Sequence, residues 1–340
     1  MAAEDRAADD AQVAVNVFPH SDTVKVAYRT DAITIHRDAM TRLKKLYVIH
    51  GASGDPELGL LNDAIYCVLR RYMTLTDQTL GASFEAAAPR GLLRLLNNEW
   101  DVCFETFASP LNSFFRNYTS PFPDTDSNFG SMGSFFQFVP QQGSFLLHPS
   151  RVQEVLDRAA SHLSHILTEQ AGPLSFIVLA PDWEDPPLAG LAELDQSPFL
   201  RAKFTAEEKS HTFISGLEHI ADGAWDTWRV VPHLGTRVYV LQNEAGAKVW
   251  SASPARISDL RECMGLGRLA EGENVIEGAE AQAEGEDTAE TTEAAAASSP
   301  PAAKTAAADE EEALLGAADG TAGDEATVND DEALLLGDDA

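Results

Sequence analysis

The sequence predicts an α/β fold in which helices cover both faces of a parallel sheet. Short apolar runs alternate with amphipathic stretches at residues 90–262, and this alternation is typical of parallel strands joined by helices. The clearest central strand is the continuous apolar run at residues 174–180, because a strand buried on both faces shows no polar alternation. One α/β domain is therefore expected in this part of the chain.

The acidic charge of the chain lies mainly in its C-terminal tail. The 340 residues carry a formal net charge of −30. Residues 269–340 hold 21 acidic residues and one basic residue, Lys304, so the preceding residues account for only −10. The tail has no aromatic residue and cannot bury enough apolar surface to offset its ordering entropy, so we expect it to be disordered. The net charge therefore says little about what the folded part binds.

Composition and pattern divide the chain into four parts. They are a flexible N-terminus at residues 1–12, strands with a helical annex at 13–89, the α/β domain at 90–262 and a disordered acidic tail at 263–340. In the second part, alternation predicts strands at 13–17 and 23–28, and helical spacing predicts helices at 32–50 and 58–73. The second helix is expected to face inward with Leu60, Ile65, Val68 and Leu69.

Within the α/β domain, apolar periodicity and turn residues predict the order of the elements. Strands are expected at residues 102–107, 135–139, 144–147, 174–180, 228–231 and 237–242, and helices at 91–97, 113–118 and 152–168. Ser109 and Pro110 suit the start of the helix at 113–118, and Ser150 suits the N-cap of the helix at 152–168.

Several classes of protein are not indicated. Cys67, Cys103 and Cys263 are scattered without a CxxC pair, so neither a zinc site nor a disulfide framework is predicted. The first ten residues are polar and acidic, unlike a signal peptide, and no run of about 18 apolar residues is present. We therefore expect a nuclear or cytoplasmic protein that is not secreted, with no membrane partner and no metal.

Three predicted strands end in polar residues. Glu105, His148 and Asp182 each stand at such an end, and open α/β sheets bind ligands at the carboxyl ends of their strands. A carboxylate there can accept hydrogen bonds from a ribose or an ammonium group, and the small residues Ala108 and Ser109 would let the backbone approach a ligand. A solvated glutamate is the commoner alternative.

Motifs in the core keep the spacing of a known family over roughly residues 60–255. They include the stretch from Phe104 to Tyr118 with Ser109-Pro110-Leu111-Asn112, then Phe122-Pro123-Asp124-Thr125-Asp126, Phe129-Gly130-Ser131, Gly143-Ser144-Phe145, Pro181-Asp182-Trp183 and Leu241-Gln242-Asn243. These motifs resemble the phosphorylated CTD-interacting factor family, the cap-specific adenosine N6-methyltransferases of messenger RNA. The WW module from which that family takes its polymerase-tail binding is not recognised in the sequence, so this binding is not carried over.

The resemblance implies a Rossmann-like S-adenosylmethionine methyltransferase fold. It places the cofactor against Glu105, Ala108, Ser109 and Asn112. In the family, one strand ends in Asn-Pro-Pro-Phe, where the asparagine and a proline carbonyl accept hydrogen bonds from the adenine amino group and the aromatic ring stacks on the base. The aligned residues here are His148-Pro149-Ser150-Arg151, so the catalytic tetrad is degenerate.

The degenerate tetrad leaves three interpretations. The first is a pseudoenzyme that keeps the fold and has weakened or lost catalysis, with an RNA- or protein-binding role. The second is an active S-adenosylmethionine-dependent mRNA (2'-O-methyladenosine-N6-)-methyltransferase with a divergent loop, in which His148 accepts one hydrogen bond and Arg151 stacks as a cation. The third is an unrelated use of the sheet.

Candidate partners are capped mRNA and a protein. Arg70, Arg71 and Arg116 are candidate RNA-binding residues, although basic residues on a solvated face are a common alternative. The tail repeats a short motif, Glu312–Gly316 and Glu332–Gly337, that favours docking of a protein partner over low-complexity drift. Two further sets have ordinary structural explanations: exposed or hydrogen-bonded side chains for His211, His219 and His233, and core packing for Phe114, Phe115 and Tyr118.

Overall fold

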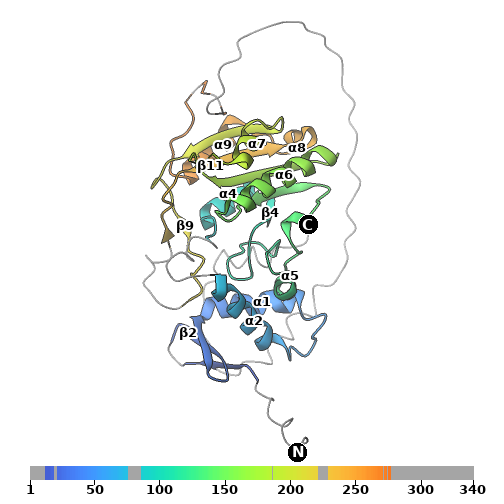
Figure 1. Ribbon diagram of the computed structural model, residues 1–340, viewed down its shortest axis with the longest axis vertical. Helices are drawn as coiled ribbons and strands as arrows, with labels where there is room; N and C mark the ends of the chain where they lie inside the picture. The colour runs from blue at the N-terminus through green and yellow to red at the C-terminus, as the bar shows by residue number, and fades with distance from the viewer. Residues whose placement is uncertain are drawn as a thin grey trace, which may run out of the picture. The chain divides into compact units, whose positions relative to one another are not determined.

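A six-stranded mixed sheet forms the centre of the computed structural model (Figure 1). Its order is β5-β4-β6-β7-β11-β8. The parallel strands are β5 (Asn117–Tyr118), β4 (Val102–Glu105), β6 (Gly143–Leu147) and β7 (Leu174–Pro181). Strand β11 (Thr236–Gln242) runs antiparallel between β7 and β8 (Leu200–Ala206). The sheet is thus mostly parallel, as predicted; the strand predicted at residues 237–242 is β11, which runs antiparallel, and β8 was not predicted.

The structure describes most of the chain before the acidic tail. The described residues are 12–18, 21–75, 86–185, 187–220, 229–270, 272–273 and 275–276. They all belong to one unit, Met1–Gly278. The tail motifs at residues 312–316 and 332–337 lie outside the described residues.

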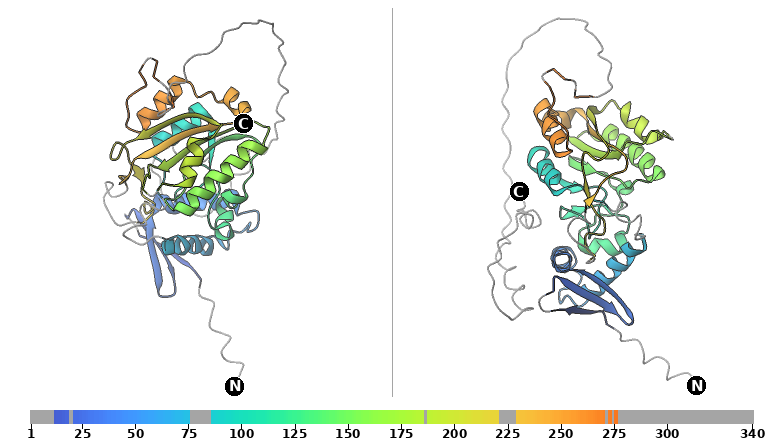
Figure 2. Two further views of the ribbon diagram at one scale, coloured as in Figure 1. Left: turned by 45° about the horizontal axis from the view of Figure 1, so that its top comes forward. Right: turned by 90° about the vertical axis from the view of Figure 1, so that its left-hand side faces the viewer.

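Helices cover both faces of the sheet, as predicted. Helices α4 (Arg90–Trp100) and α9 (Pro254–Cys263) pack on one face, and α6 (Gln153–Glu169) and α7 (Ala189–Asp195) pack on the other (Figure 2, right). Along β6, Leu146 belongs to the first core, while Phe145 and Leu147 belong to the second. This alternation places the middle of β6 and β7 between two apolar cores, which fits the expected methyltransferase-like fold.

Short elements complete the domain. They are α5 (Pro123–Asp126), the 3-10 helices η1 (Ser127–Phe129) and η2 (Phe135–Gln137), α8 (Glu244–Val249) and the two-stranded antiparallel pair β9 (Phe213–Ile214) and β10 (Arg229–Val230). The strand predicted at residues 135–139 is wrong. Its phenylalanines pack through their rings, with Phe138 stacked on Phe104 at a centroid distance of 4.7 Å, instead of joining a ladder.

The segment before Arg90 contains a small antiparallel sheet as well as helices. Strands β1 (Ala14–Val17), β2 (Thr23–Tyr28) and β3 (Asp31–His36) precede α1 (Arg37–His50) and α2 (Leu61–Leu75). The helix predicted to begin at residue 32 therefore begins at Arg37, and the prediction for its first turn is wrong. A tight turn with Arg29 at φ +54° lets residues 31–36 pair with β2 and bury Ile33 and Ile35. Ile65, Val68 and Leu69 face inward as predicted, but Leu60 precedes α2 and is 59% exposed.

Two further predictions about helices are wrong: the helix at residues 113–118 and the N-cap of α6. Residues 113–118 form turns followed by β5, because the amide groups of Phe114 and Phe115 bind a carboxylate and not the carbonyls of a preceding turn. Helix α6 begins after Val152, which makes no side-chain cap, so Ser150 is not its N-cap.

Packed structure continues beyond residue 262, where the domain was expected to end. Met264 is fully buried in the first core. The amide of Lys203 on the outer strand β8 donates to the carbonyl of Val275 over 2.9 Å. The chain thus covers part of the exposed edge of the sheet before the acidic tail begins.

A buried carboxylate joins the N-terminal helices to the α/β domain. Asp126 is fully buried and accepts hydrogen bonds from the hydroxyls of Tyr72 on α2, at 2.6 Å, and of Thr125, at 2.9 Å. Burial raises the pKa of Asp126, and hydrogen bonds from Tyr72, Ser120 and Thr125 oppose that rise. Because a buried carboxylate needs such partners, α2 is fixed against α5 at this point.

We expect Tyr72→Phe to lower the free energy of unfolding by about 1–3 kcal/mol, since it leaves a buried carboxylate short of one donor. The matched control is Tyr66→Phe, which removes the same hydroxyl from the partly exposed Asp31 and should have a much smaller effect. Urea denaturation of the two variants measures the difference. Equal losses in both would contradict the proposed importance of the Asp126 contact.

Candidate functional site

The parallel strands bring their polar ends to one edge of the sheet. Glu105 on β4 pairs with Leu146, and Leu147 on β6 pairs with Val178. Glu105, His148 and Asp182 therefore follow neighbouring strand ends, as the sequence predicted. This edge is where an open α/β sheet binds its ligand.

Glu105 is buried and holds the loop that follows its own strand. It is only 4% exposed, and its Oε2 accepts hydrogen bonds from the amides of Phe114, at 2.6 Å, and Phe115, at 3.2 Å. From α1, Arg42 donates to the carbonyl of Leu111, at 3.1 Å, and to Oγ of Ser113, at 2.7 Å. The carboxylate and the guanidinium thus fix the two ends of one turn.

Burial dominates the ionisation of this carboxyl group. It raises the pKa of Glu105 to about 7, against the opposing effects of the Phe115 and Phe114 amides and of the charge on Arg42. Burial likewise lowers the pKa of Arg42, while Tyr118 and Glu105 act in the other direction. Glu105 is therefore partly protonated at neutral pH, unlike a solvated glutamate.

The remaining predicted cofactor residues bind one another. Asn112 accepts hydrogen bonds through Oδ1 from the amide of Ser109, at 2.7 Å, and from its hydroxyl, at 3.0 Å. Ala108 and Ser109 are 5% and 1% exposed. Glu105 is engaged through Oε2 alone. Its Oε1 could accept from the ribose of a nucleoside cofactor such as S-adenosylmethionine, whereas Ser109 and Asn112 would first have to give up their mutual hydrogen bonds.

The degenerate tetrad packs against an aromatic ring from a distant part of the chain. The imidazole of His148 stacks on Phe213, with ring centroids 4.9 Å apart and an interplanar angle of 25°. Cζ of Arg151 lies 5.8 Å from the same ring centroid. Pro149 is buried beside them. Phe213 thus covers one face of His148 and lies beside Arg151.

Phe213 is fixed in this place. It is 1% exposed, and the neighbouring Ile214 exchanges two backbone hydrogen bonds of 2.9 Å with Ala87. The ring of His211 meets Phe213 edge-on at 5.3 Å, and its Nε2 hydrogen-bonds Oγ1 of Thr236 at 2.8 Å. The gap left here is too narrow for a water molecule; it is lined by His148, Pro149, Arg151, Leu179, Ala180, Pro181, Phe213 and Thr236.

The environment keeps His148 neutral. Burial, followed by the nearby Arg151 and His211, lowers the pKa of His148 to about 3. A neutral imidazole offers one acceptor and one donor, and which nitrogen carries the proton is set by its hydrogen bonds. Phe213 covers one face of this ring, while neither ring nitrogen hydrogen-bonds another of the described residues.

Asp182, the third strand-end residue, is also engaged. Its Oδ1 forms an ion pair with Nε of Arg237 on β11. The same guanidinium reaches Asp195, with Nη1 3.4 Å from Oδ2. Hydrogen bonds to Asp182 raise the pKa of Arg237 against the effect of its burial. This corner is a structural ion-pair network in the described structure.

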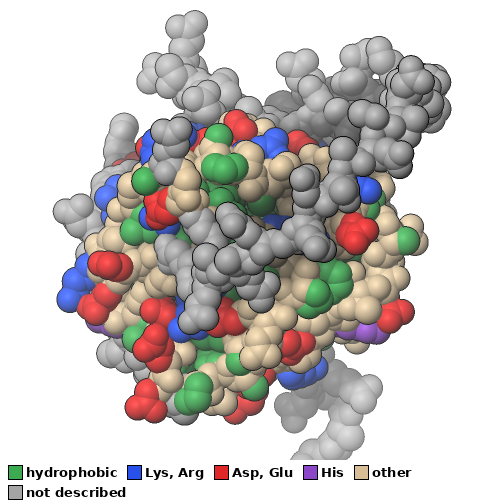
Figure 3. All heavy atoms as spheres, turned by 90° about the horizontal axis from the view of Figure 1, so that it is seen from above, with side chains coloured by type: hydrophobic (Ala, Val, Ile, Leu, Met, Phe, Trp, Pro, Cys, Tyr) green, Lys and Arg blue, Asp and Glu red, His purple; other side chains and the backbone are tan. Residues whose placement is uncertain are grey.

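Two of the three predicted RNA-binding arginines pair with acids, and the third, Arg116, directly follows Phe115 in the loop that binds Glu105. Nε of Arg70 is 3.2 Å from Oδ2 of Asp31. Arg71 contacts both oxygens of Asp124, at 3.3 and 2.8 Å. Arg116 is half-buried. On the face seen in Figure 3, basic and acidic side chains are interspersed and the visible basic ones do not gather in one area.

Of the three late histidines, His211 is buried and hydrogen-bonded, His219 is buried, and His233 is exposed. Phe115 and Tyr118 pack in the core as predicted, at 3% and 0% exposure. Sequence reasoning missed Phe213. It stands in the short apolar pair Phe213-Ile214, and no local signal shows that this pair returns to the strand ends.

Among the described residues, none of the helices combines the length and the apolar composition that a membrane span requires. No group of three or more histidine, cysteine or acidic side chains in that part of the chain is placed to hold a metal ion.

The buried Glu105 makes stability depend on pH. Its folded-state pKa of about 7 exceeds the ordinary value of 4.5, so the folded protein binds more protons than the unfolded chain between these values and stability falls as pH rises through that window. Glu105→Gln should remove roughly 3 kcal/mol of this decline between about pH 5 and about pH 8. Chemical denaturation across this range measures it, with the exposed Glu57→Gln as control; a decline unchanged in Glu105→Gln would refute the assignment.

Comparison with known proteins gives the family. Residues 42–216 match the family described as "Phosphorylated CTD interacting factor 1 WW domain". These residues run from α1 to just beyond β9, so the match covers α/β structure. The human and mouse proteins named mRNA (2'-O-methyladenosine-N(6)-)-methyltransferase are each 33% identical over 248 residues, which is 72% of this chain and 35% of those proteins. The chain spans about a third of the length of these relatives. It belongs to the phosphorylated CTD-interacting factor 1 family.

Proposed function

We propose that this protein is a methyltransferase-like member of its family with weakened or lost catalysis, and that it acts by binding capped mRNA. Nuclear or cytoplasmic mRNA would be its target. A protein partner of the tail motifs at residues 312–316 and 332–337 is a second part of the proposal. The names of the relatives support mRNA as the ligand. The arrangement of the site supports the proposed weakening or loss of catalysis.

The packing of Phe213 against His148 carries this proposal. Methyl transfer to an adenine amino group needs the base stacked and its amino hydrogens held by acceptors, because orientation supplies much of the rate. Phe213 covers one face of His148 and lies beside Arg151, the residue aligned with the family's stacking ring, and the gap around it does not admit water. His148 replaces the amide acceptor and Arg151 replaces the aromatic ring.

The cofactor loop supports the same proposal. Methyltransferase relatives imply S-adenosylmethionine as methyl donor. In this chain, Glu105 binds the Phe114 and Phe115 amides, and Asn112 binds Ser109. Cofactor binding would require the loop to exchange these hydrogen bonds for contacts with the ligand.

The alternative is an active mRNA (2'-O-methyladenosine-N6-)-methyltransferase. The 33% identity to the human and mouse methyltransferases favours it, as does the retained Pro149. Under this alternative, Phe213 and the loop after Glu105 both move when substrates bind, and neutral His148 accepts one hydrogen from the amino group.

Labelled methyl donor tests the proposal directly. The full chain, incubated with labelled S-adenosylmethionine and capped RNA that begins with 2'-O-methyladenosine, should incorporate at least about 100-fold less label than the human relative under the same conditions, because the tetrad is altered and Phe213 packs against it. Incorporation at a rate close to that of the human relative would overturn the proposal and establish the active alternative.

Two designed variants separate the causes of inactivity. The first carries His148→Asn, Ser150→Pro and Arg151→Phe together; the second adds Phe213→Ala. We expect no transfer by the first, since Phe213 still fills the base position. Thermal shift with S-adenosylmethionine, which stabilises only a protein that binds it, reports separately on the cofactor loop. Transfer by the first variant would show that the tetrad alone limits the reaction.

A further inference from the structure

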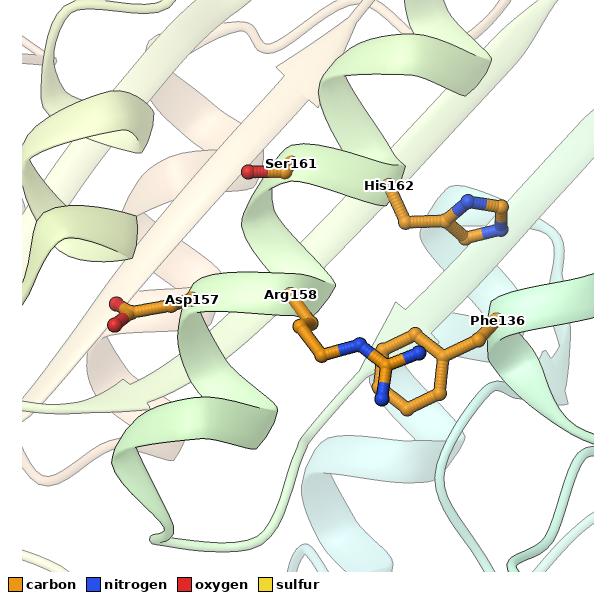
Figure 4. Close-up of a pocket in the computed structure, with 5 residues that line it drawn as sticks. All are labelled: Phe136, Asp157, Arg158, Ser161 and His162. Carbon is orange, nitrogen blue, oxygen red and sulfur yellow. The ribbon is translucent and has the colours of Figure 1, made fainter.

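We propose that an open groove on the outer side of α6 binds a nucleobase of single-stranded RNA by stacking it on Arg158. This inference rests on the proposed RNA-binding role of the domain. The groove has a volume of about 390 Å³ and is lined by Phe136, Asp157, Arg158, Ser161 and His162 (Figure 4). Its volume is within the range of small-ligand sites, roughly 300–1,000 Å³.

A supported guanidinium forms the platform of the groove. Cζ of Arg158 lies 4.3 Å from the centroid of the Phe136 ring, and Figure 4 shows the guanidinium over this ring. Phe136 is itself held by Phe107, at 6.0 Å, and Phe135, at 5.9 Å. One face of the guanidinium is thus covered by an aromatic ring whose position is fixed by other rings, while the side chain remains exposed.

Arg158 forms no ion pair with another of the described residues. Among the described residues, no carboxylate pairs with it. The nearby polar groups bind elsewhere: Asp157 accepts from the amide of Gly190 at 2.7 Å, and Ser161 donates to Glu193 at 2.8 Å. His162 Nε2 contacts the carbonyl of Phe138 at 3.0 Å. Arg158 therefore keeps its donors and its outer face for a ligand, unlike Arg70 and Arg71.

A nucleobase is the ligand that matches this platform. Bases of single-stranded RNA stack on aromatic rings and on arginine planes, and a base placed on Arg158 would complete a three-layer stack with Phe136. The positive charge attracts the adjoining phosphate, and free guanidinium N–H groups can bind its oxygens. Helix α6 begins directly after the tetrad loop, and Arg158 is its sixth residue, so the groove lies on the element that follows the tetrad.

The test compares an arginine, a lysine and an alanine at position 158. The probe is a fluorescein-labelled oligoadenylate of about 12 nucleotides, within the length that one single-strand binding domain covers. Fluorescence anisotropy should show that Arg158→Ala and Arg158→Lys both weaken binding about 10-fold, as expected for one lost stacking contact. Because lysine keeps the charge, Arg158→Lys should lower affinity without changing the dependence on salt.

Arg268→Ala is the matched control, since it removes one exposed positive charge on a remote segment; it should bind RNA like the natural chain. Full affinity in Arg158→Lys would overturn the stacking inference, because charge alone would then explain binding. Absence of binding by the natural chain, or equal weakening by Arg268→Ala, would overturn it as well. None of these outcomes bears on methyl transfer, which the labelled-donor assay decides independently.

Discussion

The hydrogen bonds between Glu105 and the amides of Phe114 and Phe115 are the contact on which the site depends. A carboxylate buried at the end of β4 needs donors, because an unpaired buried acceptor costs several times what a typical hydrogen bond contributes. The chain supplies two of its own amides nine and ten residues later. These hydrogen bonds hold the loop in turns and use one of the two carboxylate oxygens, and Arg42 of α1 binds the same loop through Leu111 and Ser113.

Side chains at the other strand ends also have partners within the protein. His148 stacks on Phe213, Asp182 pairs with Arg237, and Asn112 binds Ser109. In a binding site, groups at this edge keep capacity for a ligand, and their buried polarity is compensated only when the ligand is present. Here Asp182 and Asn112 have partners within the protein, and Phe213 covers one face of His148. Contacts of this kind therefore extend beyond the altered tetrad.

Hydrophobic periodicity correctly predicted the strands and helices that can pack against any apolar surface. The apolar runs of β6 and β7 and the helical spacing of α6 need only an apolar layer to pack against. It failed where a specific distant partner decides the structure. A helix was predicted at residues 113–118, but Glu105 accepts hydrogen bonds from amides in this segment. A helix was also predicted at residues 32–36, but the turn at Arg29 lets them pair with β2. Phe213 could not be found for the same reason, since its importance lies in meeting His148.

The fold can persist without the reaction because different residues maintain each. The two cores are built from the middle of the strands and the helices, and the opposite end of the sheet is tied by Asn243. Its Oδ1 accepts from the amides of Leu174 and Gly246, and its Nδ2 donates to two carbonyls before β7. None of these contacts involves the tetrad loop. The tetrad residues His148 and Arg151 therefore lie outside the contacts that maintain the framework, and the ring of Phe213 beside them belongs to the first core.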